Sequence, residues 1–135
     1  GKQINGFEIF SANRFENLAY DHVSFGANAD PVVQLEVSLL SWRNHFYADI
    51  YAEKGNAHIQ SLCKWGPSTF TYRDRKLPSG RPDEESVTLV QPDPTWELEY
   101  EHFKNICREG SGNIENDIWI NRTLGNLSST LKTSL

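Results

Sequence analysis

Apolar and polar residues alternate along residues 32–59, which read VVQLEVSLLSWRNHFYADIYAEKGNAHI. A period of two predicts β-strands, because successive side chains of a strand point to opposite faces of its sheet. The alternation covers residues 33–40, returns over residues 45–52, and resumes at Ala57 and Ile59 after Glu-Lys-Gly-Asn. We therefore predict three antiparallel strands at the centre of a larger sheet, with Gly55 supplying the positive φ of a tight turn.

The two connecting turns predict the register, because facing residues of an antiparallel hairpin keep a constant sum of residue numbers. The predicted pairs are Ala52–Ala57, Tyr51–His58 and Ile50–Ile59 around a turn at Lys54-Gly55, and Leu39–Phe46, Val37–Ala48 and Leu35–Ile50 around a turn at Trp42-Arg43. Both sets place the apolar residues on one face of the sheet. A slip of one residue would destroy this agreement.

Shorter strand-like stretches flank this centre at residues 2–11, 20–26, 69–72 and 86–91, and the charged residues 73–85 are predicted to form a loop. A helical period follows. Asp93 and Pro94 form a helix start, Gly110 is a helix stop, and a second helix is predicted from about Glu115. The apolar residues that recur at helical spacing are Trp96, Tyr100, Phe103 and Cys107 in the first helix, and Ile120, Leu124, Leu127, Leu131 and Leu135 in the second.

This order of elements predicts an α+β fold. We expect an open-faced, mostly antiparallel sheet of about six or seven strands, with the two C-terminal helices packed on its apolar face. The length of 135 residues suits one domain, which we place over residues 1–135.

Charge and cysteine content narrow the classes of partner. A net charge of −5 argues against nucleic acid or an anionic membrane as the main partner. Cys63 and Cys107 are far apart in the sequence, so neither a disulfide framework nor a thiolate metal site is expected. No apolar run approaches the ~20 residues that a membrane span requires. These features predict a soluble, cytoplasmic protein with reduced cysteines.

The second face of the predicted sheet mixes polar residues with large side chains. His45 and His58 should share it with Asp49 and Glu36, which would suit a metal or an acid–base site. Cross-strand polar pairs account for the same residues without such a site, and their spacing matches no ligand motif, so we predict no metal site. An exposed apolar patch is predicted there from Leu40, Tyr47, Tyr51 and Leu62. Such a patch favours a homodimer or tetramer through this face.

The sequence Trp42-Arg43-Asn44-His45 is the strongest candidate for a binding site. A tryptophan provides a stacking surface and an arginine a bidentate donor, which together suit a sugar or a phosphate. The alternative is that Trp42 covers the sheet edge while Arg43 is solvated. Asn13 and Arg14, in the first loop, form a weaker candidate of the same kind. No nucleophile motif or dinucleotide fingerprint is present in the sequence.

Three segments, in their order and spacing, resemble the C-terminal domain of the Gfo/Idh/MocA oxidoreductases, the relatives of glucose–fructose oxidoreductase and inositol dehydrogenase. Residues 35–42 resemble a strand that ends in Ser-Trp, and residues 50–59 resemble a strand, a Glu-Lys-Gly turn and a further strand. Residues 98–110 resemble the motif L-x-x-E-H-F-x-x-C-I-x-x-G, with Ile106 and Cys107 in exchanged order. The resemblance extends over almost the whole chain.

This resemblance implies a substrate-side and oligomerisation domain of an NAD(P)-dependent enzyme that acts on a sugar, a nucleotide sugar or a polyol. In the family an N-terminal Rossmann domain binds NAD or NADP, and the catalytic lysine and histidine motifs precede the domain that this chain resembles. The resemblance therefore assigns no catalytic, cofactor-binding or metal-binding residue to this chain. It implies that the chain alone binds no cofactor and is inactive, and that its own Rossmann domain and a small sugar substrate are its partners.

Two other interpretations stay open. A stand-alone, non-catalytic dimerisation or ligand-binding α+β domain would use the mixed sheet face to contact itself or a partner. A small cone-shaped α+β enzyme with an internal pocket is disfavoured, because such a fold needs a helix before a strongly curved sheet and both predicted helices come last.

Overall fold

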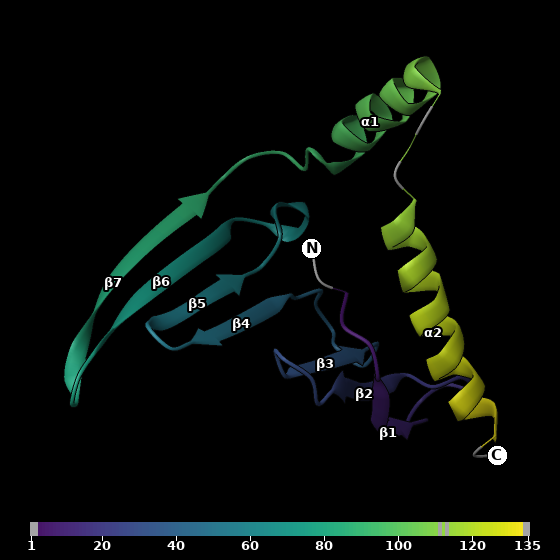
Figure 1. The fold of residues 1–135 in the computed structure, drawn as a ribbon, viewed down its shortest axis with the longest axis horizontal. Coiled ribbons are helices and arrows are strands. Elements are labelled where there is room, and N and C mark those ends of the chain that lie inside the picture. The colour runs from purple at the N-terminus through teal and green to yellow at the C-terminus, as the bar shows by residue number, and fades with distance from the viewer. Residues whose placement is uncertain (1–2, 111, 113, 134–135) are drawn as a thin grey trace. The chain divides into compact units, whose positions relative to one another are not determined.

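The computed structural model describes residues 3–110, 112 and 114–133, with side chains described as far as Leu131, and Leu135 of the predicted second helix lies outside them (Figure 1). Seven β-strands precede two α-helices, and all of the strand pairings are antiparallel. The predicted α+β class is confirmed. Within the described residues, neither helix combines the length and the apolar character that crossing a membrane requires.

The chain groups into two compact units, each with its own sheet and helix. The first unit contains the described parts of residues 1–41 and 111–135, and the second contains residues 42–110. The first unit consists of β1 (Glu8–Asn13), β2 (His22–Ala27), β3 (Val33–Ser38) and α2 (Glu115–Thr133). The second consists of β4 (Tyr47–Ala52), β5 (Gly55–Gln60), the 3-10 helix η1 (Cys63–Trp65), β6 (Ser68–Lys76), β7 (Gly80–Leu89) and α1 (Thr95–Glu109). The strands thus form a three-stranded and a four-stranded sheet instead of one.

The first predicted hairpin does not form, because β3 pairs with β2 and not with β4. The pairs Leu39–Phe46, Val37–Ala48 and Leu35–Ile50 are therefore wrong. Val37 faces Val23 instead, and the amide of Leu39 donates to the carbonyl of Asp21 at 2.8 Å. Alternation determines the face that a residue occupies, but β2 and β4 share the same period, so it does not select the partner. The turn-forming sequence of residues 28–32 favours the β2–β3 connection.

The second predicted hairpin forms with a register shifted by two residues. Ile50 faces Ala57 and Asp49 faces His58, so the turn residues are Glu53 and Lys54. A shift of two keeps every side chain on its predicted face, because the side-chain period is also two. Gly55 has no positive φ and serves a different purpose from the predicted one: a Cβ atom there would clash with the carbonyl oxygen of Arg73 on β6.

The predicted loop over residues 73–85 is wrong, because these residues form the outer part of the β6–β7 hairpin. Charged side chains pair across it: Arg73 Nε lies 2.5 Å from Glu84 Oε2, and Lys76 Nζ lies 2.6 Å from Asp83 Oδ2. An edge strand tolerates exposed charges, and it tolerates Pro82 because the missing N–H need not face a neighbour. Charge density was thus a misleading signal for a loop.

The two helices belong to different units, and each is described with the sheet of its own unit. In the first unit α2 contacts β1 and the segment before it, where Trp119 Nε1 donates to the carbonyl of Ile4 at 3.0 Å and the Trp119 ring meets Phe7 edge-on at 6.4 Å. In the second unit no residue of α1 is buried. The predicted helix stop is confirmed, since Gly110 has φ 63° and its amide donates to Ile106.

A buried carboxylate organises the β1–β2 loop of the first unit. Asp21 is 2% exposed, and its carboxylate oxygens accept the backbone amides of Phe15, Glu16 and Asn17 at 2.7–3.1 Å. These hydrogen bonds lower the pKa of Asp21 to about 2, because they stabilise the ionised form. The bond from the Glu16 amide makes the largest contribution. Hydrogen bonds to the buried carboxylate of Asp21 therefore fix the conformation of this loop.

We predict that the first unit loses stability as the pH falls from about 4 toward 2. Because the folded pKa of Asp21 lies below its ordinary value of 3.8, its contribution is complete above that value and disappears as the folded carboxylate protonates. Asp21→Asn should lower the urea midpoint at pH 7 and flatten its dependence on pH in this range. Glu8→Gln, at an exposed carboxylate of β1, should change neither quantity. Equal acid sensitivity of Asp21→Asn and the parent would contradict the assignment.

Candidate functional site

The four-stranded sheet of the second unit has one polar and one apolar face. The residues that face one another across the polar face form three rows: Tyr47, Gln60, Thr69 and Thr88; Asp49, His58, Thr71 and Ser86; and Tyr51, Asn56, Arg73 and Glu84. The central row of the apolar face contains Ala48, Ile59, Phe70 and Val87. Both faces follow from the period of two that the sequence shows.

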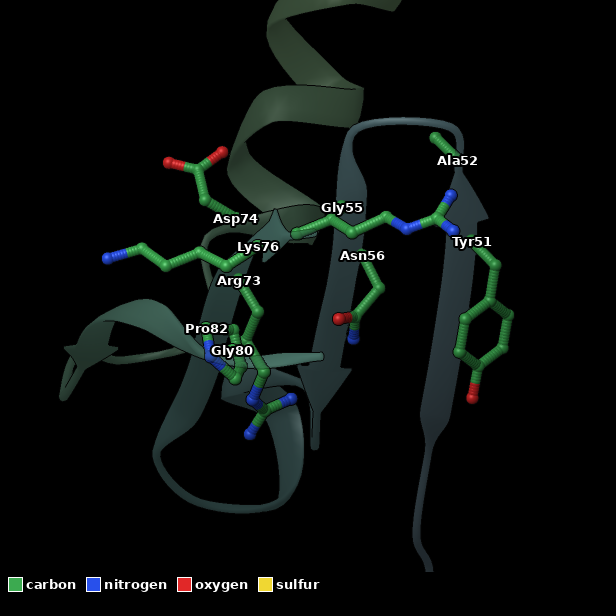
Figure 2. A pocket seen from close by; sticks show the side chains of 10 residues that line it. Tyr51, Ala52, Gly55, Asn56, Arg73, Asp74, Lys76, Gly80 and Pro82 are labelled. Atoms are coloured by element: carbon green, nitrogen blue, oxygen red, sulfur yellow. The ribbon is translucent and has the colours of Figure 1, made fainter. Parts of the chain in front are cut away.

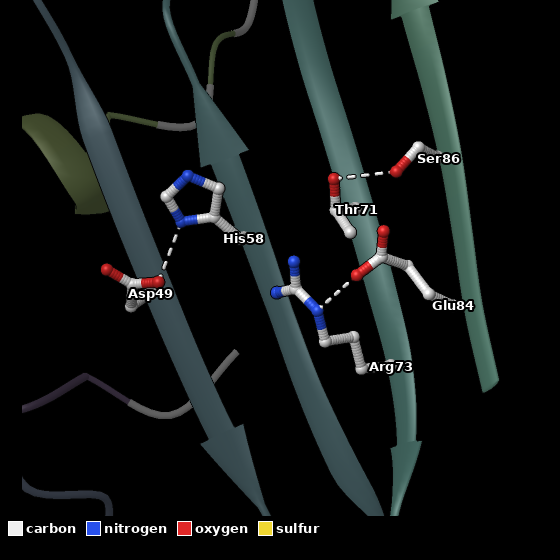
Figure 3. A network of polar contacts seen from close by, with 6 residues as sticks. All are labelled: Asp49, His58, Thr71, Arg73, Glu84 and Ser86. Atoms are coloured by element: carbon white, nitrogen blue, oxygen red, sulfur yellow. Dashed lines mark hydrogen bonds and ion pairs between the residues drawn. The ribbon is translucent and has the colours of Figure 1, made fainter. Parts of the chain in front are cut away.

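The polar face holds a network of paired side chains (Figure 3). His58 Nδ1 lies 2.7 Å from Asp49 Oδ1, so the predicted sharing of a face by these two residues is confirmed. Thr71 is 6% exposed, and its hydroxyl is 2.9 Å from that of Ser86. Glu36 lies on β3 in the other sheet, so the prediction that it shares a sheet face with Asp49 and His58 is wrong. Each such cross-strand pair contributes roughly 0.2–1 kcal/mol, which suits a structural role.

No group of three or more His, Cys, Asp or Glu side chains is arranged to hold a metal ion within the described part of the chain. Cys63 and Cys107 are both free thiols. On the polar face, Asp49 pairs with His58 and Arg73 pairs with Glu84.

A pocket of about 490 Å³ opens where the chain enters β4 and leaves β5, and we call it the β4-entry pocket. Its lining residues are Arg43, Asn44, His45, Phe46, Tyr47, Gln60, Ser61 and Trp65. All of them belong to the second unit. The pocket thus combines a guanidinium, an imidazole, two amides and three aromatic rings, with no carboxylate among its lining residues.

Backbone hydrogen bonds of Ser61, one of the lining residues, connect the segments around this pocket. The Ser61 amide donates to the carbonyl of Phe46 at 2.8 Å, which extends the β4–β5 pairing by one bond. The carbonyl of Ser61 accepts the hydroxyl of Ser68 at 3.0 Å. Ser61 has φ 64°, and no other non-glycine residue in the described chain has a positive φ. Such a conformation is costly for a residue with a side chain, and its occurrence next to a pocket is typical of functional sites.

Three rings connect the pocket to the polar face of the sheet. The centroids of His45 and Tyr47 are 5.6 Å apart, and Tyr47 stacks on His58 with centroids 6.1 Å apart. His45 Nδ1 lies 3.2 Å from the carbonyl oxygen of Arg43. Because a carbonyl oxygen only accepts, Nδ1 carries the proton in this hydrogen bond. The contact holds the imidazole against the backbone of the pocket rim.

The structure brings together three of the six predicted binding residues. Arg43, Asn44 and His45 line the β4-entry pocket, whereas Trp42 is fully exposed and is not among the lining residues. Asn13 and Arg14 belong to the first unit, where Asn13 ends β1 and the Arg14 guanidinium lies 4.5 Å from the centroid of the Tyr20 ring. The role of these residues in binding a substrate stays a prediction.

Five further lining residues were not predicted as binding residues from the sequence: Phe46, Tyr47, Gln60, Ser61 and Trp65. Trp65 precedes Gly66 and Pro67, a break in the pattern that places a large ring at the end of a strand connection. This sequence signal could have suggested Trp65 as the aromatic partner in place of Trp42. Gln60 carried no comparable signal, because it reaches the pocket only through the register of β5.

A second pocket of about 390 Å³ lies at the turn end of the same sheet, and we call it the hairpin pocket (Figure 2). Three cations line it, Arg73, Arg75 and Lys76. Arg73 and Lys76 pair with Glu84 and Asp83, and Arg75 Nη1 donates to the carbonyl of Glu53 at 3.4 Å. The charges of this pocket are therefore largely balanced within the sheet.

No protein-family model, no curated protein and no solved structure matches this chain.

We predict that two substitutions of Ser61 change the free energy of unfolding in opposite directions. Ser61→Gly should raise the free energy of unfolding by about 0.5–1 kcal/mol, because glycine adopts a positive φ without steric cost. Ser61→Val should lower it by about 1–2 kcal/mol, because a β-branched residue is poorly accommodated there. Urea titrations of both variants provide the measurement. A stabilised Ser61→Val would contradict the left-handed conformation.

Proposed function

We propose that this chain is the substrate-side and oligomerisation domain of an NAD(P)-dependent oxidoreductase that acts on a sugar, a nucleotide sugar or a polyol. The observation that carries the proposal is the lining of the β4-entry pocket. Amides and an imidazole offer hydrogen bonds to hydroxyl groups, while the rings of Tyr47 and Trp65 offer apolar surfaces. Hydroxylated rings and chains present both kinds of surface, since they have polar hydroxyls and apolar C–H groups.

The sequence resemblance supports the same proposal independently. The Ser-Trp pair and the Glu-Lys-Gly sequence that carry the resemblance lie on either side of the first pocket-lining segment in the sequence, at residues 41–42 and 53–55. NAD or NADP would bind to a Rossmann domain of the longer parent enzyme, which would also supply the catalytic groups. Under this proposal the parent is cytoplasmic, and the present chain contributes substrate contacts and subunit contacts.

The proposed oligomer uses the polar face of the four-stranded sheet. Tyr51 and Tyr47 are 79% and 57% exposed on this face, and Leu62 is 37% exposed. Exposed aromatic side chains on an open sheet support an interface, because a second copy would remove them from water. Leu40, the fourth predicted interface residue, lies in the first unit.

A stand-alone, non-catalytic dimerisation or ligand-binding α+β domain is the alternative. The same exposed tyrosines favour it, because dimerisation requires neither a sugar nor a nucleotide. The two proposals differ in their ligands: the first requires a hydroxyl-rich small molecule in the β4-entry pocket, and pure dimerisation requires none.

We predict that a ligand among sugars, sugar acids, sugar phosphates, nucleotide sugars and polyols shifts the amide signals of the β4-entry pocket in NMR titrations. Trp65→Ala should weaken binding by about two- to twelvefold, because a stacking ring contributes roughly 0.5–1.5 kcal/mol. Trp42→Ala is the matched control, and its affinity should equal that of the parent. Loss of binding in Trp42→Ala but not in Trp65→Ala would contradict the placement of the pocket.

We predict no saturable binding of NAD or NADP to this chain in calorimetric titrations at micromolar concentrations, and no turnover with either cofactor. The reason is that the proposed nucleotide site belongs to another domain of the parent. Micromolar affinity of this chain for either cofactor would refute the proposed division of roles.

We predict that sedimentation at high micromolar concentration detects a dimer or tetramer. Tyr51→Glu should shift the chain toward the monomer, because it places a charge in the proposed contact. Tyr100→Glu, at an exposed tyrosine of α1, should leave the distribution unchanged. A monomeric parent chain under these conditions would exclude the proposed interface.

A further inference from the structure

The two pockets of the four-stranded sheet differ in their charge balance. In the hairpin pocket, Arg73 and Lys76 each contact a carboxylate. In the β4-entry pocket, Arg43 makes neither an ion pair nor a side-chain hydrogen bond with any other described residue, and no acidic residue contributes to the lining. Arg43 thus brings a permanent positive charge to the lining of this pocket, and no carboxylate among the lining residues neutralises it.

This imbalance is local and opposes the charge of the chain as a whole. The net charge of −5 repels anions at long range, so a site that attracts them has to do so through its own donors. A guanidinium is permanently charged and offers paired N–H donors whose geometry matches a carboxylate or a phosphate. An uncharged ligand would leave these donors to water and would gain nothing from the charge.

We propose that the ligand of the β4-entry pocket is a sugar or polyol that carries an oxyanion, and that Arg43 binds this group. The proposal rests on the proposed function and specifies its substrate class. Asn44 and Gln60 would bind hydroxyl groups of the same ligand through their side-chain amides, and the Trp65 ring would pack against its C–H groups. A carboxylate or a phosphate fulfils the requirement of Arg43 equally, because both present two oxygens to the guanidinium fork.

The experiment compares four ligands by calorimetry and by NMR titration of the intact chain: a neutral hexose, the corresponding uronate, the hexose 6-phosphate and inorganic phosphate. We expect the uronate or the hexose phosphate to bind at least tenfold more tightly than the neutral hexose, and their order identifies the preferred oxyanion. Arg43→Gln should weaken the anionic ligand by about tenfold to a hundredfold, the range for loss of a charge-assisted hydrogen bond, and should leave the neutral hexose unchanged. Arg43→Lys should fall between them, because it keeps the charge but loses the fork.

Arg75→Gln is the matched control, because it removes a guanidinium of the hairpin pocket without leaving a carboxylate unpaired. It should retain the affinity of the parent for every ligand, and a loss equal to that of Arg43→Gln would overturn the assignment to Arg43.

Equal affinities of the neutral hexose and its anionic forms would overturn the inference and leave the proposed function intact. Binding of inorganic phosphate as tight as that of the hexose phosphate would reduce the pocket to an adventitious anion site. If none of the three sugars binds, the result contradicts both the inference and the proposed function.

Discussion

Backbone pairing between neighbouring antiparallel strands is the constraint on which the second unit depends. Few side chains are fully buried: Thr71 is the one buried residue described in the four-stranded sheet, and α1 contributes none. The sheet is therefore held by its hydrogen-bond ladder and by contacts between adjacent strands. That ladder also forms the β4-entry pocket, since the bond from Ser61 to Phe46 joins the two chain segments that line it. The site is in this sense an extension of the β4–β5 pairing beyond the ends of the two strands.

The sequence predicts well which face of a sheet a residue occupies, and it predicts poorly which strands pair with each other. Alternation correctly placed Asp49 and His58 on one face, and helical spacing with Asp93 and Gly110 correctly located α1. Both signals are local, because they depend on residues a few positions apart. The choice of β2 rather than β4 as the neighbour of β3 is not local, and several strands with equal period satisfied the same pattern. The error over residues 73–85 has a related cause, because charge alone does not tell a loop from an edge hairpin with paired ions.

The candidate site was predictable to a similar degree. Arg43, Asn44 and His45 were identified because their chemistry is contiguous in the sequence, and they do line one pocket. Gln60 and Trp65 reach that pocket only because β5 returns antiparallel to β4, which no single stretch of sequence reveals. Trp42 was chosen for its chemistry and its position next to Arg43, yet it is fully exposed and lies outside the pocket that its neighbour lines. Trp42 and Arg43 lie in a bend of the chain, where neighbouring side chains need not point the same way, so adjacency is a weak guide to a shared site.

The shift of two residues between the expected and the observed β4–β5 hairpin has a consequence for folding specificity. On the apolar face both registers set Ile50 against an aliphatic residue, Ala57 in the observed register and Ile59 in the other. On the polar face they are not equivalent: only the observed register sets Asp49 opposite His58, whereas the other would set Tyr51 there. A contact that adds little to the free energy of folding can thus decide which of two nearly degenerate alignments the chain adopts. Substitution of Asp49 or His58 would then change the melting temperature little, but it would allow the hairpin to adopt more than one register.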